Sequence, residues 1–202
     1  MKRRSLSCTL GLSVAILLAI GAATATANRL SVSNRNIRAV WTPVDMDNVI
    51  ECNLTMEGTF HSATFSKTIG GQIGHITRSA VSNCSESFTV LTEDLPWPIL
   101  YQRFTGRLPR IASLGIAIVS YSLNVGISGI QCLYRAGEVS PVQAIANINE
   151  ATGQVTGLRM DETAPISLAE GGFLCPDEMH FSGTGTVRQL GSTTALIFIR
   201  LI

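Results

Sequence analysis

Apolar and polar residues alternate with a period of two along most of this chain, and this pattern constrains its fold more than any other feature of the sequence. The clearest stretch runs from Ala117 to Val125, where every second side chain is apolar. Because such alternation places successive side chains on opposite faces of a strand, it predicts a sheet with one buried face. Residues 49–65 alternate likewise, and their length indicates a strand that bends or bulges at Gly58.

Short runs rich in β-branched or aromatic residues recur along the rest of the chain, separated by turn residues such as Asn83 and Gly153. They span residues 29–34, 37–42, 75–82, 87–93, 98–105, 129–135, 142–149, 154–161, 164–169, 179–188 and 194–202. About a dozen short strands at this spacing favour a sandwich or a barrel over an α/β arrangement. We therefore expect an all-β fold, a single antiparallel β-sandwich or barrel-like domain. The last run is apolar on both faces apart from Arg200, so we expect it to lie centrally in a sheet.

One segment, residues 66–76, has mixed signals. Ile69, Ile73 and Ile76 recur at helical spacing, but three glycines lie among them. Each glycine costs about 1 kcal/mol relative to alanine in a helix. We expect at most one short helix near residues 66–76.

Residues 1–27 have the pattern of a secretory signal peptide. Basic residues from Lys2 to Arg4 precede an uncharged stretch, Thr9 to Ala23, and the triplet Ala25-Thr26-Ala27 resembles a cleavage site. The apolar stretch is shorter than the roughly 20 residues that a membrane-spanning helix needs. We expect export by either the Sec or the twin-arginine route, no transmembrane segment after removal of the signal, and a single β domain over residues 28–202. The expected location is extracytoplasmic, either secreted or in the cell envelope.

Charge excludes one class of partner. The whole chain carries a net charge of +1, and without the three basic residues of the leader it has 12 Lys and Arg against 14 Asp and Glu. A nearly neutral, slightly acidic chain without basic runs does not favour nucleic acid. A ligand in the cell envelope or outside the cell remains a possible partner. No cofactor motif is present, and we expect no cofactor.

Four of the five cysteines follow the leader: Cys52, Cys84, Cys132 and Cys175. An even number in an oxidising compartment predicts two disulfides, and zinc is the less favoured alternative because no C-x2-C pair occurs. Four cysteines allow three connectivities. We prefer the sequential one, because it joins neighbouring strands within each half of the chain.

Glu178 and His180 are the only candidates for acid/base chemistry that the spacing offers. They share one strand face, where a carboxylate beside an imidazole forms an acid/base couple, half of a metal site or, as we favour, a cross-strand ion pair. A serine nucleophile has no support, because Gly126 to Ile130 misses the G-x-S-x-G elbow by one place. His61 falls on the polar face of its strand and is interpreted as a solvated residue.

Two further clusters carry alternative readings. Asp45, Asp47 and Asn48 offer oxygen ligands as the opening of a calcium loop does, but the glycine and the distal glutamate are missing, and an ordinary turn is favoured. Trp97 and Tyr101 would form a stacking platform for sugars or peptides if they were exposed. In a chain with only 6% aromatic residues, we favour a tryptophan that anchors the core.

Several short segments resemble uncharacterised exported β-rich proteins of soil actinobacteria. They are Leu95-Pro96-Trp97, Phe104-Thr105-Gly106-Arg107-Leu108-Pro109, Cys132-Leu133-Tyr134 and Phe181-Ser182-Gly183-Thr184-Gly185. The resemblance implies a bacterial exported protein with paired cysteines, and it implies no activity or site residues.

The absence of a catalytic motif makes a non-enzymatic binding or structural role in the cell envelope or outside the cell the leading hypothesis. The alternative is a secreted hydrolase that uses Glu178 and His180 as its acid/base couple.

Overall fold

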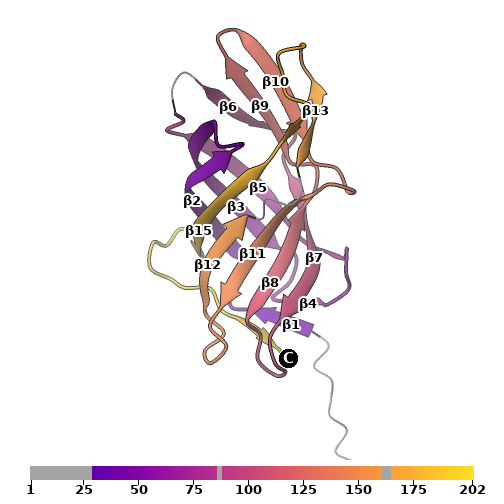
Figure 1. The fold of residues 1–202 in the computed structure, drawn as a ribbon. Helices are drawn as coiled ribbons and strands as arrows, with labels where there is room; N and C mark the ends of the chain where they lie inside the picture. Colours follow the sequence, from indigo (N-terminus) through magenta and orange to yellow (C-terminus); the bar gives the residue numbers. More distant parts are fainter. Residues whose placement is uncertain (1–28, 86–87, 161–164) are drawn as a thin grey trace, which may run out of the picture.

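The computed structural model describes residues 29–85, 88–160 and 165–202. All regular secondary structure in these ranges is β-strand (Figure 1). The expected signal peptide, residues 1–27, lies outside the described residues. Within the described ranges, no helix offers the length and apolar character needed to cross a membrane.

Eight strands form a closed antiparallel barrel. They are β2 (Asn36–Met46), β3 (Ile50–Phe60), β5 (Gln72–Ser82), β7 (Trp97–Thr105), β8 (Ser113–Ile118), β11 (Val142–Ile148), β12 (Val155–Met160) and β15 (Phe181–Gln189). Each pairs with the next of these in chain order, and β15 returns to pair with β2. The barrel is therefore of the up-and-down type, which removes every free sheet edge among its strands. Of the two expected architectures, sandwich and barrel, the chain adopts the barrel.

Two smaller sheets extend from the barrel. One has the order β14-β13-β10-β9-β6 and consists of β6 (Thr89–Glu93), β9 (Ser122–Ile127), β10 (Ile130–Arg135), β13 (Ile166–Glu170) and β14 (Glu178–Met179). The other has the order β16-β1-β4 and consists of β1 (Arg29–Val32), β4 (Thr64–Ser66) and β16 (Ile199–Leu201). Figure 1 shows them toward opposite ends of the barrel, the second beside the C-terminus.

The prediction of a single strand over Ala117–Val125 is wrong. The chain breaks between β8, which ends at Ile118, and β9, which begins at Ser122. Ser120 has φ 58°, a left-handed conformation that ends a strand, and its N–H donates to the carbonyl of Ala136 at 2.9 Å. The apolar alternation continues across the break, but the first half belongs to the barrel and the second to the five-stranded sheet. The expectation of one buried face is also wrong, because the adjacent residues Ala117 and Ile118 are both buried.

Other local expectations are settled by the backbone. The bulge at Gly58 is confirmed, because the register of β3 against β5 shifts between Glu57 and Gly58. The segment 66–76 forms no helix; a turn with Gly70 at φ 74° leads into β5. The final run is not central to a regular sheet: β16 is an edge strand of the three-stranded sheet, paired with β1, and its other side meets the chain before β12 through an isolated bridge between Gln154 and Phe198.

Both disulfides join the expected partners. Cys52 of β3 is bonded to Cys84, which follows the neighbouring strand β5, and Cys132 of β10 is bonded to Cys175, beyond the neighbouring strand β13. The sequential pairing is therefore confirmed, and two disulfides are compatible with an oxidising, extracytoplasmic environment.

Candidate functional site

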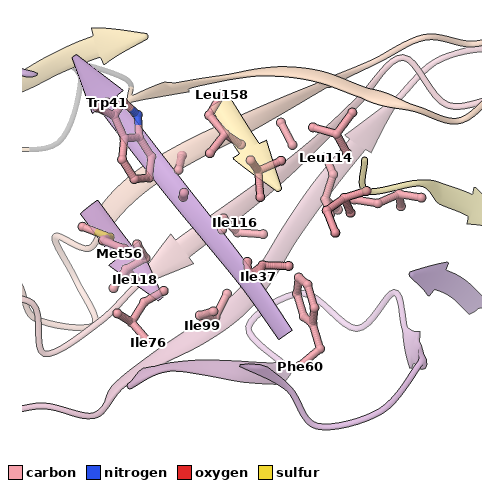
Figure 2. A pocket seen from close by; sticks show the side chains of 17 residues that line it. Ile37, Trp41, Met56, Phe60, Ile76, Ile99, Leu114, Ile116, Ile118 and Leu158 are labelled. Atoms are coloured by element: carbon pink, nitrogen blue, oxygen red, sulfur yellow. The ribbon is translucent and has the colours of Figure 1, made fainter. Parts of the chain in front are cut away.

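The interior of the barrel contains an apolar cavity of about 60 Å³ (Figure 2). All eight barrel strands contribute side chains to its wall, and Ile197 and Ile199 of the C-terminal segment complete it. In the view of Figure 2, the indole of Trp41 and the ring of Phe60 lie at opposite ends of the group of lining side chains, with Ile116 between them. Every lining residue is hydrophobic, so the cavity is suited to an apolar occupant.

The cavity exists because small residues occupy part of its wall. Ala39 on β2 and Ala144 and Ala146 on β11 face it, where larger side chains would fill the space. Elsewhere the core is filled by large aromatic rings: Trp97 and Tyr121 lie 4.5 Å apart between ring centroids. An eight-stranded barrel is wide enough either for side chains to fill or for one small ligand, and these alanines leave room.

Trp41 supplies the one polar side-chain atom of this wall. The residue is 2% exposed, and its Nε1–H has no hydrogen-bond acceptor within the described part of the chain. The other tryptophan differs, because Trp97 donates its Nε1–H to the carbonyl of Glu93 at 2.8 Å. Buried donors are almost always paired, so the Trp41 indole is an exception that requires an explanation.

Gly185 of β15 fixes the indole of Trp41 from the neighbouring strand. The two residues are register partners, and a Cβ on Gly185 would lie 2.9 Å from Cδ1 and from Cγ of Trp41. The absence of a side chain at this position therefore lets the indole approach the backbone of β15 closely.

Four residues singled out from the sequence meet at the β2–β3 turn. Asp47 and Asn48 have φ 55° and 57°, and Asp45 accepts a hydrogen bond from the backbone N–H of Asn48 at 2.6 Å. Asp47 Oδ1 accepts the backbone N–H of His180 at 3.0 Å and lies 2.9 Å from His180 Nδ1. Asp45, Asp47 and Asn48 thus close a hairpin turn, as favoured, and Asp47 also ties that turn to the start of β15.

The same residues border a shallow surface hollow that Ser182 also lines. The carboxylate that contacts the imidazole of His180 is that of Asp47, not that of Glu178 as the sequence suggested. Glu178 is exposed on β14. Across the described ranges, no group of three or more His, Cys, Asp or Glu residues is arranged to hold a metal ion. The near-match to a nucleophile elbow is a hairpin turn between β9 and β10, with Ser128 at φ 50° and Gly129 at φ 87°.

Trp97 and Tyr101 both lie in the core. They are 0% and 3% exposed, so neither presents a face on which a sugar or peptide could stack. Burial raises the pKa of the Tyr101 hydroxyl above its ordinary value of 10.0.

Sequence reasoning missed two features. Nothing in the pattern separates Trp41 from any other buried aromatic residue of a strand, because the cavity is formed by side chains from the whole barrel. His75 was not singled out either, although it lies against His61 across the β3–β5 pair, with 2.9 Å between His61 Nε2 and His75 Nδ1.

Comparison of this chain with protein-family models, with curated proteins and with solved structures finds no match.

Proposed function

We propose that this protein is a binding protein whose barrel encloses a small apolar ligand with one hydrogen-bond acceptor. The observation that carries the proposal is the apolar cavity whose lining residues include Trp41, which has an unpaired Nε1–H. A non-enzymatic binding or structural role is the leading hypothesis from the sequence, and the cavity supports the binding role.

Water is a poor occupant of this cavity. A buried water needs two to four polar partners, and the wall offers one side-chain donor. If the cavity stays empty, its volume of about 60 Å³ costs roughly 1.5 kcal/mol of stability. A small apolar molecule with a carbonyl or ether oxygen would both fill the space and accept the indole proton.

We propose further that the ligand is bound outside the cytoplasm, after removal of residues 1–27, in the envelope or the surroundings of a bacterial cell. The two disulfides and the pattern of the leader support this location.

The test uses dimethyl ether and propane, which are small enough for a cavity of about 60 Å³ and differ in that an ether oxygen replaces the central methylene group. Titration of the ¹⁵N-labelled protein is followed by NMR at the two tryptophan indole N–H signals. We expect both probes to shift the Trp41 signal saturably, the ether moving its proton downfield, while the Trp97 signal, which already has an acceptor, stays in place. The variant Trp41→Phe should weaken the binding of dimethyl ether by roughly 2- to 12-fold, the worth of one hydrogen bond, and change that of propane by less than about twofold.

Two leucine variants of β11 separate filling of the cavity from a general effect on the strand. Ala144→Leu places the added atoms in the cavity and should weaken both probes by at least about tenfold. Asn147→Leu adds the same side chain at an exposed position and should leave binding unchanged. If neither probe produces a saturable shift, or if both variants behave alike, the proposal is wrong.

The alternative, a secreted hydrolase, draws support from the contact between Asp47 and His180, because an aspartate that holds Nδ1 leaves Nε2 free to act as a base. Against it, no described hydroxyl or other group forms a hydrogen bond with that Nε2. Turnover in a screen of ester and peptide substrates that disappears in His180→Ala would favour the hydrolase over the binding role.

A further inference from the structure

His61 and His75 form a pair of imidazoles on the outside of the barrel wall. His75 lies on β5 opposite Thr59 of β3, and His61 follows the end of β3, where its N–H donates to the carbonyl of Ile73 at 2.9 Å. The two histidines are therefore diagonal neighbours across one strand pair, a position from which long side chains meet. Their ring centroids are 4.8 Å apart, and His61 Nε2 lies 2.9 Å from His75 Nδ1.

The two facing nitrogens are close to the separation at which they would share a metal ion. With bonds of 2.0–2.1 Å from Zn²⁺ to nitrogen and a tetrahedral angle, two ligand nitrogens lie about 3.3 Å apart. The observed 2.9 Å is the length of a hydrogen bond in which one ring donates its N–H to the other. A metal ion would displace that proton, and a small rotation of the exposed His61 ring would move the nitrogens apart by the few tenths of an ångström required. Both side chains are reachable from solvent, since His61 is exposed and His75 is half-buried.

Gln72 provides the outer partner that a metal-bound imidazole requires. Its Nε2 lies 2.6 Å from His75 Nε2, on the side of the ring away from His61. When a metal takes His75 Nδ1, the ring proton resides on Nε2, and rotation of the Gln72 amide presents its oxygen to that N–H. Metal-bound histidines almost always donate their second N–H to such an acceptor, which fixes the ring and its tautomer.

We propose that His61 and His75 bind a divalent transition-metal ion such as Zn²⁺ or Cu²⁺, with water in the remaining coordination positions and Gln72 orienting His75. Imidazole suits these ions, whereas Mg²⁺ prefers oxygen ligands. The site joins the segment after β3 to β5, so occupancy ties two neighbouring parts of the barrel wall together. It is separate from the cavity and does not depend on the proposed ligand.

The test is isothermal titration of the chain with Zn²⁺, with Cys8→Ser in every sample so that the leader thiol does not compete. We expect one Zn²⁺ per chain and no Mg²⁺ binding. His61→Gln and His75→Gln should each lower the Zn²⁺ affinity by at least about tenfold, and Gln72→Ala by roughly 10- to 100-fold, as for other partners of metal-bound histidines.

His180→Gln is the matched control, because His180 is the third and last histidine of the chain and is paired with Asp47 instead. It should leave Zn²⁺ binding unchanged. Zn²⁺ should also raise the melting temperature of the wild type and of His180→Gln but not of His61→Gln, since an ion that binds only the folded state stabilises it. Absence of saturable binding, or binding that survives His61→Gln or is lost in His180→Gln, would overturn the proposal.

Discussion

Tyr121 occupies the centre of the core at an energetic cost. The residue is fully buried, and its hydroxyl has no hydrogen-bond partner in the part of the chain that the structure describes. Tyr121→Phe removes this unpaired group and keeps the ring against Trp97 and Phe181, so we expect it to raise the free energy of unfolding by about 1 kcal/mol. Tyr121→Leu, which loses the ring contacts, should lower it. Urea unfolding measures both, and a destabilised Tyr121→Phe would contradict the account.

The same residue gives a pH dependence with a definite sign. Burial raises the pKa of the Tyr121 hydroxyl above the ordinary value of 10.0, because the phenolate is costly in an apolar core. Below pH 10 the hydroxyl is protonated in both the folded and the unfolded chain, so its titration does not change the free energy of unfolding. Above pH 10 the unfolded chain loses the proton while the folded chain keeps it, and the free energy of unfolding falls by up to about 1.4 kcal/mol per pH unit. Tyr121→Phe should therefore lose less stability than the wild type between pH 10 and 11 in the same urea experiment.

At the scale of single residues, the sequence predicted the roles of the polar turn residues better than those of the residues that line the cavity. Asp and Asn side chains favour turns, and Asp45, Asp47 and Asn48 do form the turn between β2 and β3. The partner of His180 was missed because Asp47 is remote in sequence and reaches it only through the pairing of β2 with β15. Trp41 could not be recognised, because an unpaired donor is a property of its surroundings.

At the scale of strands, β15 is shaped by its glycines. A Cβ on Gly185 would lie 2.5 Å from the carbonyl oxygen of Val40 and would press on the Trp41 indole. We expect Gly185→Ala to lower the free energy of unfolding by about 1–3 kcal/mol and to shift the Trp41 indole signal. Gly157→Ala is the control on β12, because the nearest atom to its Cβ would be 3.6 Å away, an ordinary contact. Equal effects of the two substitutions would show that Gly185 is not a packing position.

Strand positions were largely predictable, and sheet membership was not. The run 142–149 corresponds to β11 at Val142–Ile148, and 98–105 to β7 at Trp97–Thr105. The expectation for Ala117–Val125 failed because alternation along the chain does not specify to which sheet a segment belongs, and Ile118 and Ser122 of the face expected to be exposed are buried as well. The C-terminal run failed for a related reason: Ile197 and Ile199 are buried against the barrel interior, although the run forms only a short strand and an isolated bridge.

For the whole molecule, the choice between a sandwich and a barrel depends on a single long-range pairing. β2 and β15 begin at Asn36 and Phe181, and only their pairing closes the sheet. No local pattern encodes such a contact, whereas the disulfides, which join neighbouring strands, followed from cysteine count and spacing. Closure is also what creates an interior, so the candidate site was beyond prediction from the sequence.

The central claim, that the barrel holds an apolar ligand cavity, is tested most directly by crystallography of the protein under xenon pressure. Xenon enters apolar cavities and needs no hydrogen bond. We expect one xenon site inside the wild-type barrel, between Trp41 and Phe60, and no such site in Ala144→Leu. A barrel interior without xenon, or a xenon site that persists unchanged in Ala144→Leu, would contradict the account.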